Sequence, residues 1–112
     1  MKEKLLKLLK ERKEINLTDL PIIMPEIIGV FSMYIPVKSG YNPNILLLQN
    51  VNQDFIIAFN ELQSEKIVEF KLVDIMVFIF DNSPIYTIDL CNKKLAKTQK
   101  HCWQPTQLIL IN

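Results

Sequence analysis

The stretch that most constrains how this chain folds is residues 72–80, in which Asp74 is the only polar residue. Such a segment leaves a large apolar area in water unless it packs against other elements. A helix would gather five apolar side chains on one face: Leu72, Ile75, Met76, Ile79 and Phe80. A strand buried on both faces would instead suit the β-branched row of Val73, Ile75, Val77 and Ile79. We favour a helix over 72–81, ended by the sequence Asp-Asn-Ser-Pro.

Alternation of apolar and polar residues predicts strands elsewhere. Residues 85–90 alternate regularly and are expected to form a half-buried strand. Residues 26–37 and 106–111 are two further strand candidates. Residues 45–49 and 54–59 are apolar runs on either side of an Asn-Val-Asn-Gln sequence, which predicts a β-hairpin.

Helices are expected at two further places. Residues 2–13 carry an apolar stripe among lysines and glutamates, typical of an amphipathic helix: Leu5, Leu8 and Leu9. Asn60 is a candidate N-cap for a short helix through Glu65. Between the first helix and the first strand, residues 16–25 form a connector in which two prolines oppose a regular helix. Four apolar residues of this connector are expected in the core: Leu17, Leu20, Ile22 and Ile23.

These elements together predict the α+β class. The expected architecture is one domain, residues 1–112, with a mostly antiparallel sheet of about five strands. The N-terminal amphipathic helix and a central apolar helix are expected to pack on this sheet. Residues 38–44 contain glycine, proline and asparagine and are expected to form a loop. The composition, 49% hydrophobic and 22% charged, is typical of a globular protein.

The sequence gives no sign of a membrane segment or of a secreted protein. The longest apolar run is the six residues 75–80, whereas a membrane span needs about 20 residues. Lysines and glutamates interrupt the N-terminal leucines throughout, unlike the apolar core of a signal peptide. Cys91 and Cys102 are too few for a disulfide framework, so we expect a reducing cytoplasm.

The net charge of +1 is divided unevenly along the chain. Residues 1–14 carry six Lys or Arg and three Glu, a net charge of +3. Residues 15–90 carry three Lys and nine Asp or Glu, a net charge of −6. Residues 91–112 carry four Lys and no acid, a net charge of +4. An acidic body with basic ends favours charged binding partners.

No catalytic or metal-binding motif is evident. His101 is the only histidine, and Cys102 is its neighbour in sequence. Adjacent side chains point in different directions, so His101 is poorly placed to activate Cys102 as a nucleophile. Cys91, His101 and Cys102 are also too few to close a zinc site. We therefore expect a surface imidazole, two half-buried thiols, no catalytic residue, no metal and no cofactor.

The C-terminal segment 93–103 offers an alternative function in nucleic-acid binding. Its lysines would meet phosphates and Trp103 would stack on a base: the lysines are Lys93, Lys94, Lys97 and Lys100. Arginine, which is favoured for bidentate contacts to phosphate or guanine, is absent from this segment. We therefore favour a solvated lysine face around a packed tryptophan.

Four sequence segments, MYIPV, ILLL, FIIAFNELQSE and VDIMVFIFDNSPIYTIDL, together resemble the SseB-type domain of bacteria over residues 33–90. Phe59-Asn60-Glu61 stands where that family has Phe-Thr-Ser-Glu, and Asp89-Leu90 stands where it has Asn-Pro. The resemblance implies a strand, a hairpin and a buried helix in this order, and it favours a helix over 72–81.

In size, acidic body and lack of a catalytic motif, the chain also resembles small immunity proteins of bacterial toxin systems, including those of contact-dependent inhibition. This resemblance implies a non-enzymatic cytoplasmic protein that binds and neutralises a toxin, for example a nuclease with a basic surface. An acidic surface accelerates association with such a partner. The expected partner-binding residues are Tyr41, Asp54, Glu61, Glu65, Glu69 and Asp89.

Overall fold

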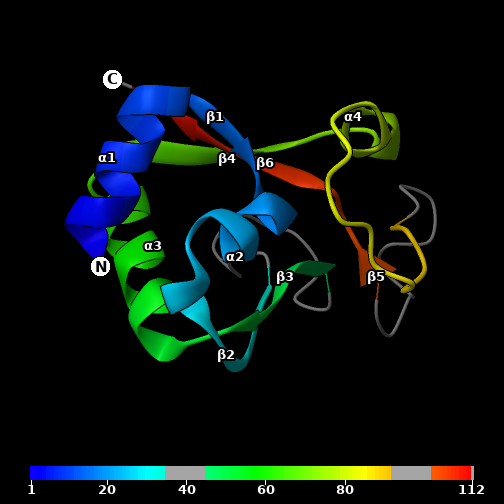
Figure 1. Ribbon diagram of the computed structural model, residues 1–112, viewed down its shortest axis with the longest axis horizontal. Helices are drawn as coiled ribbons and strands as arrows, with labels where there is room; N and C mark the ends of the chain where they lie inside the picture. Colours follow the sequence, from blue (N-terminus) through cyan, green and yellow to red (C-terminus); the bar gives the residue numbers. More distant parts are fainter. Residues whose placement is uncertain (35–44, 92–101, 112) are drawn as a thin grey trace.

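The computed structural model describes residues 1–34, 45–91 and 102–111. These residues form two small three-stranded sheets flanked by helices (Figure 1). The α+β class is confirmed, whereas the single sheet of about five strands is wrong. Within these ranges, no helix is both long enough and apolar enough to span a membrane.

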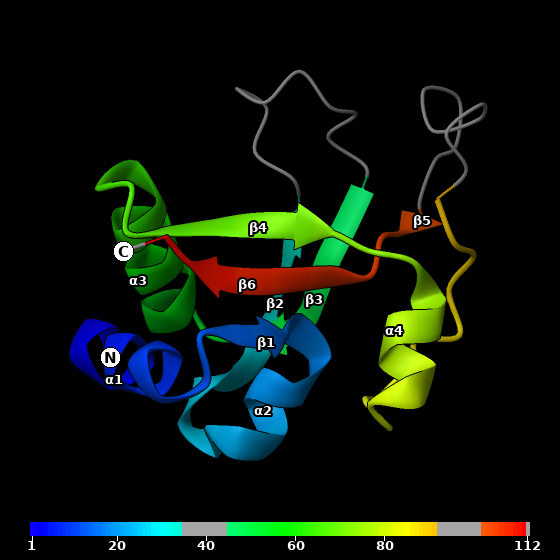
Figure 2. The ribbon, with the colours of Figure 1, turned by 90° about the horizontal axis from the view of Figure 1, so that it is seen from above.

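The first sheet has the strand order β1-β6-β4, and all its neighbours are antiparallel. Its strands are β1 (Glu14–Asn16), β6 (Thr106–Leu110) and β4 (Val68–Leu72). The central strand β6 confirms the strand expected at 106–111. The first and last strands of the sequence therefore lie side by side, and both termini lie at the same end of the molecule (Figure 2).

The second sheet has the order β2-β3-β5. Strand β2 (Ile28–Tyr34) runs antiparallel to β3 (Ile45–Val51), and β5 (Cys102–Trp103) pairs with β3 in parallel. Two residues of β2 lie opposite Val51, so the pairing contains a β-bulge. Strand β2 confirms the strand expected within 26–37 and forms one edge of the sheet.

Helices α1 (Lys2–Arg12) and α3 (Gln53–Ser64) lie side by side and cover one end of the molecule (Figure 1). The helix expected at 2–13 is confirmed, with Leu5 and Leu9 fully buried. Its stripe belongs to a core that also includes residues of α3 and of both sheets, such as Phe55, Phe59, Leu62, Leu47 and Leu108.

The hairpin predicted over 45–59 is wrong, because its second half belongs to helix α3. Four apolar residues recur at helical spacing and are buried: Phe55, Ala58, Phe59 and Leu62. Asn52 is the N-cap, since its side-chain oxygen accepts a hydrogen bond of 2.9 Å from the backbone N–H of Phe55. Asn60, the predicted cap, lies inside the helix.

Asn52 also joins α3 to the start of β2. Its side-chain amide donates to the carbonyl oxygen of Glu26 over 2.7 Å, and its backbone N–H donates to that of Ile27 over 2.7 Å. The chain approaches so closely here that a Cβ added to Gly29 would lie 2.6 Å from the Cα of Asn52. Glycine is therefore required at this position by space.

The connector forms three short helical turns, η1 (Leu17–Asp19), α2 (Leu20–Ile23) and η2 (Pro25–Ile27). Both α2 and η2 have a proline in their first turn. Proline is tolerated there because the first N–H groups of a helix have no acceptor within the helix. Leu17 and Leu20 are buried as expected, and Ile23 packs partly against the core. The expected burial of Ile22 is wrong, because that side chain is 66% exposed.

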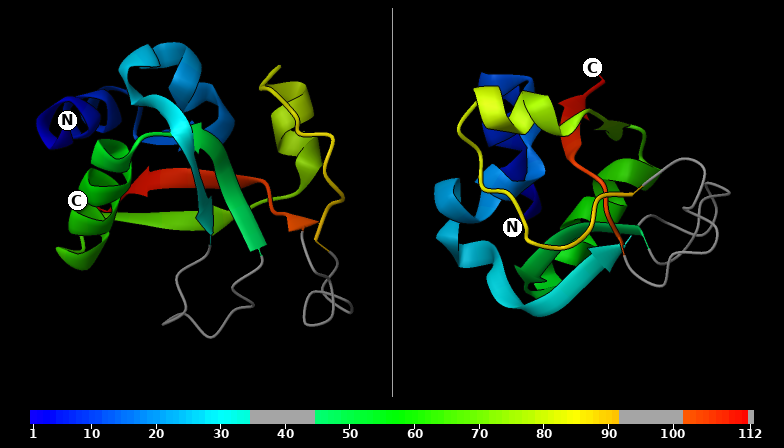
Figure 3. Two further views of the ribbon diagram at one scale, coloured as in Figure 1. Left: turned by 90° about the horizontal axis from the view of Figure 1, so that it is seen from below. Right: turned by 90° about the vertical axis from the view of Figure 1, so that its right-hand side faces the viewer.

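The segment 72–90 contains one helix and no extended strand. The predicted helix is confirmed as α4 (Ile75–Phe80), whereas Leu72 ends strand β4. The strand predicted at 85–90 is wrong: Leu90 alone forms an isolated bridge, with Trp103. Helix α4 stands at the end of the molecule opposite α1 and α3 (Figure 3).

Candidate binding surface on helix α4

Helix α4 is short but well terminated at both ends. The Asp74 carboxylate accepts a hydrogen bond of 2.9 Å from the N–H of Met76, as an N-cap does. At the other end, the N–H of Ser83 donates to the carbonyl of Phe78 over 2.9 Å, and Asn82 has a left-handed φ of 55°. This is the Schellman pattern, in which asparagine tolerates the positive φ. The helix is therefore fixed by its local sequence.

The inner face of α4 packs on a second, small apolar cluster. Phe78 and Trp103 are both fully buried, with their ring centres 5.7 Å apart in a T-shaped contact. Tyr86 also packs on Trp103, with their ring centres 4.9 Å apart, and its hydroxyl accepts a hydrogen bond from the N–H of Gln49. Burial raises the pKa of the Tyr86 phenol. Phe78 alone thus anchors α4 by a fully buried side chain.

A disulfide bond joins Cys91 to Cys102 beside this cluster, with a Cα–Cα distance of 4.9 Å. The expectation of two half-buried thiols is wrong, because the two cysteines, 11 residues apart in the sequence, are bonded to each other. The N–H of Cys91 donates to the carbonyl of Trp103, and the N–H of Trp103 donates to that of Asp89. These bonds align the two cysteine backbones and tie the segment after α4 to strand β5.

The outer face of α4 is apolar and exposed. Met76, Ile79 and Phe80 share this face at i, i+3 and i+4, and they are 46%, 44% and 78% exposed. Ile85, just beyond the helix, is 47% exposed.

At about 200 Å² for each fully exposed side chain of this size, these four residues leave roughly 400 Å² of apolar surface in water. The largest apolar patch on a typical monomer is about 300–600 Å², and such patches are often functional, so this face is a candidate binding surface. The expectation that 72–80 would be buried is therefore confirmed for the inner face with Phe78 and wrong for Met76, Ile79 and Phe80.

Carboxylates accompany this apolar surface. Asp74, Asp81 and Asp89 are all exposed, and no lysine or arginine occurs between residues 72 and 91. The net charge of this segment is therefore −3. We call Met76, Ile79, Phe80 and Ile85, together with these three aspartates, the α4 surface.

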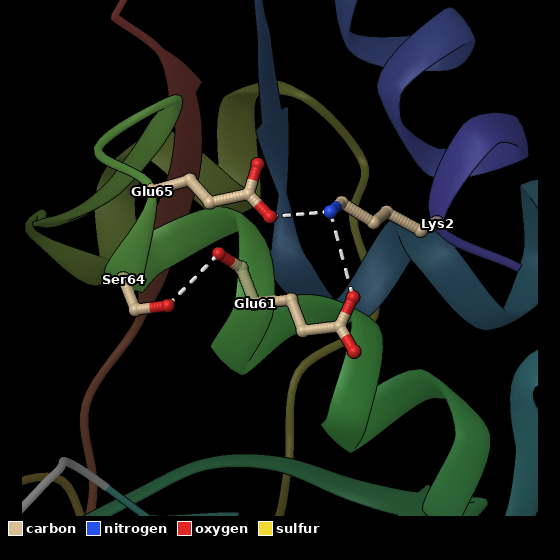
Figure 4. Close-up of polar contacts among 4 residues, drawn as sticks. All are labelled: Lys2, Glu61, Ser64 and Glu65. Carbon is tan, nitrogen blue, oxygen red and sulfur yellow. Dashed lines mark hydrogen bonds and ion pairs between the residues drawn. The ribbon is translucent and has the colours of Figure 1, made fainter.

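Two of the predicted partner-binding residues, Glu61 and Glu65, form ion pairs within the protein. Lys2 of α1 lies between Glu61 and Glu65 of α3, 3.5 Å from Glu61 and hydrogen-bonded to Glu65 (Figure 4). The hydrogen bond to Glu65 raises the pKa of Lys2. These carboxylates connect α1 to α3 and share one positive charge, so they offer less charge to a partner than the sequence indicates.

The other predicted residues do not form one site with them. Asp54 is exposed in the first turn of α3, and Glu69 is exposed on β4. Asp89 is exposed, and its carbonyl accepts a hydrogen bond from Trp103 of β5. Strand β5 lies at the opposite end of the molecule from α3 (Figure 2). Tyr41 and the expected loop 38–44 lie outside the described residues. Of the six predicted residues, Asp89 belongs to the α4 surface.

The basic segment is described only at its end. Lys93, Lys94, Lys97, Lys100 and His101 lie outside the described residues. Trp103 is 0% exposed, so its predicted role as a platform for a nucleic-acid base is wrong and the packed-tryptophan alternative is confirmed. No acceptor for its indole N–H occurs in the part of the chain that the structure describes. Among the described residues, no three His, Cys, Asp or Glu side chains are grouped as metal ligands.

A second exposed apolar surface lies on edge strand β2. Ile28, Val30 and Phe31 are 56%, 87% and 50% exposed. Strand β2 contains no charged residue, so it offers a partner no electrostatic complementarity. The α4 surface combines apolar area with charge and is the stronger candidate.

Buried polar side chains form a network behind the end of α4. Asn16 donates to the Asp81 carboxylate and to the Ser83 hydroxyl, each over 2.9 Å, and accepts from Gln107 over 3.0 Å. Ser83 in turn donates to Asp19 over 2.9 Å. The sequence gives no sign of this network, because its members are up to 91 residues apart.

Comparisons of the chain with protein-family models, with curated proteins and with solved structures found no match. The resemblances to the SseB-type domain and to immunity proteins therefore stay predictions.

Proposed function

We propose that this chain is a non-enzymatic protein-binding module that docks a basic partner protein on the α4 surface. The observation that carries the proposal is the 78% exposure of Phe80 beside Met76 and Ile79, on a helix face that none of the described helices and strands covers. A large aromatic side chain on a fixed helix is the kind of residue that becomes a binding hot spot.

The accompanying aspartates support a basic partner. Apolar side chains at the centre of an interface supply most of the affinity, whereas charges at its rim accelerate association and select the partner. Asp74, Asp81 and Asp89 have no cationic neighbour in the sequence between residues 72 and 91. A partner with an apolar patch surrounded by lysines or arginines would complement this surface.

Within this class of function, we propose an immunity protein whose partner is a bacterial toxin. The net charge of −6 on residues 15–90 supports association with a toxin that is basic where it holds nucleic acid. Co-expression with the product of a neighbouring toxin gene tests this step. Growth should be rescued by the natural chain and lost with Phe80→Gln; growth arrest in both cases would contradict it.

The disulfide bears on the cytoplasmic location that we propose for this function. Disulfides persist in oxidising compartments and are rare in the cytoplasm. The Cys91–Cys102 pair should therefore be reduced in a cytoplasmic protein, and trapping of free thiols in intact cells measures this. A fully oxidised pair would place the protein in another compartment and leave the docking proposal unchanged.

Differential capture from the source cell tests the docking proposal. The full chain, Phe80→Gln and Val30→Gln are immobilised in parallel, and the retained proteins are quantified by mass spectrometry. Both variants replace an exposed apolar side chain, so each should leave the free energy of unfolding unchanged. The partner should be lost from Phe80→Gln and retained by Val30→Gln. Retention by Phe80→Gln would contradict the proposal.

A further inference from the structure

A polar pocket with a volume of about 310 Å³ opens where α1, β1, η1 and the end of α4 meet. This volume is at the lower end of the range for small-molecule sites. Its polar lining comes from distant parts of the chain: Arg12, Glu14, Asn16, Asp19, Asp81 and Gln107.

Two carboxylates of the pocket are held in place from behind. One oxygen of Asp81 accepts from Asn16, and one oxygen of Asp19 accepts from Ser83. Asn16 and Ser83 are 4% and 5% exposed and are bonded to each other, so the two carboxylates are joined by a buried chain. Within residues 1–34, 45–91 and 102–111, no donor reaches the second oxygen of either carboxylate, so each can accept a hydrogen bond from a ligand.

The charges around the pocket are not paired with one another. Ion pairs within 4.0 Å among the described residues are made by Lys2 and Lys4, so Arg12 pairs with no carboxylate of the pocket. The pocket is therefore lined by one guanidinium, that of Arg12, and by the three carboxylates of Glu14, Asp19 and Asp81. A ligand that complements all of them carries both signs of charge, with positive charge in excess.

We propose that this pocket binds a small zwitterion with excess positive charge, the chemistry of a basic free amino acid. Its ammonium and guanidinium groups would donate to Asp19 and Asp81, and its carboxylate would accept a bidentate pair from Arg12. A phosphate ligand is disfavoured by the three carboxylates. A bare metal ion is disfavoured by Arg12 and by the lack of three grouped ligands among the described residues.

Calorimetric titration of the isolated protein at low salt tests the proposal, with L-arginine and agmatine as paired probes. Agmatine lacks the carboxylate and should bind about tenfold more weakly, and L-glutamate should not bind. Arg12→Gln should lower the affinity for L-arginine to that for agmatine and leave agmatine binding no weaker. Asp81→Asn and, separately, Asp19→Asn should weaken both probes about tenfold. Glu3→Gln, an exposed change on α1 outside the pocket, is the charge-matched control.

Three outcomes would overturn the proposal: no binding of L-arginine at tens of millimolar, equal binding of agmatine, or binding unchanged by both aspartate variants. Unfolding curves for each variant verify that the fold is kept. The inference does not depend on the docking partner. Phe80→Gln should keep the affinity for L-arginine even where it loses the protein partner.

Discussion

Replacing Asn52 by alanine tests the junction that places α3 after β3. The variant loses the N-cap bond to Phe55 and the amide bond to the carbonyl of Glu26. An N-cap contributes about 1 kcal/mol, and a partly exposed hydrogen bond contributes about 0.5–1.5 kcal/mol. The free energy of unfolding should therefore fall by about 2 kcal/mol, a decrease in Tm of roughly 8 °C for a chain of this size.

Urea unfolding followed by circular dichroism measures this change, and Asn60→Ala is the matched control. Asn60 is exposed inside α3, where alanine has the higher helix propensity, so its replacement should change stability by less than about 0.5 kcal/mol. Asn52→Asp keeps the capping acceptor and should retain about half of the lost stability. A larger loss for Asn60→Ala than for Asn52→Ala would refute this account and restore the predicted cap at Asn60.

Three further predictions concern the interior. Removal of the disulfide by Cys91→Ser with Cys102→Ser should lower the free energy of unfolding by roughly 2–3 kcal/mol. Equal stability of the natural chain with and without reductant would contradict this. Thr18 has a buried hydroxyl that bonds to no other described residue, so Thr18→Val should stabilise the fold by about 1 kcal/mol in urea unfolding; destabilisation would show that the hydroxyl is bonded. Because burial raises the pKa of Tyr86 above 10.0, the stability that it contributes is fully present below pH 10.0 and is lost as the pH rises through the folded-state pKa. Absorbance titration of the natural chain against Tyr86→Phe checks this, and an ordinary phenol titration would contradict it.

Local patterns predicted the elements whose periodicity has one interpretation. Leu5, Leu8 and Leu9 of α1 recur at i, i+3 and i+4, and β6 follows a proline that separates it from the preceding segment. The first half of helix α3 was missed because Phe55-Ile56-Ile57-Ala58-Phe59 is apolar on every face, and both periods fit such a run. Its second half lies within the short helix predicted from Asn60 through Glu65. Asn52 was assigned to a turn because asparagine is favoured in turns and at N-caps alike.

Tertiary arrangement accounts for the remaining differences. The division into two sheets depends on β6 pairing with both β1 and β4, and local periodicity does not encode such distant partners. The same holds for the pairing of Asn16 with Gln107 and for Lys2 between Glu61 and Glu65. Helix α4 was found by its pattern, but its exposure was not, because a run of apolar residues predicts burial in a core and in an interface equally well.

Site-specific photo-crosslinking in the cell that makes the protein shows whether the outer face of α4 contacts a protein partner. A photoreactive phenylalanine analogue is placed at Phe80 and, as the control, at exposed Lys7 of α1. The account predicts one dominant cross-linked protein from position 80 and not from position 7, with a yield that falls for Asp89→Lys but not for Glu3→Lys. The same products from both positions, or no product from position 80, would contradict it.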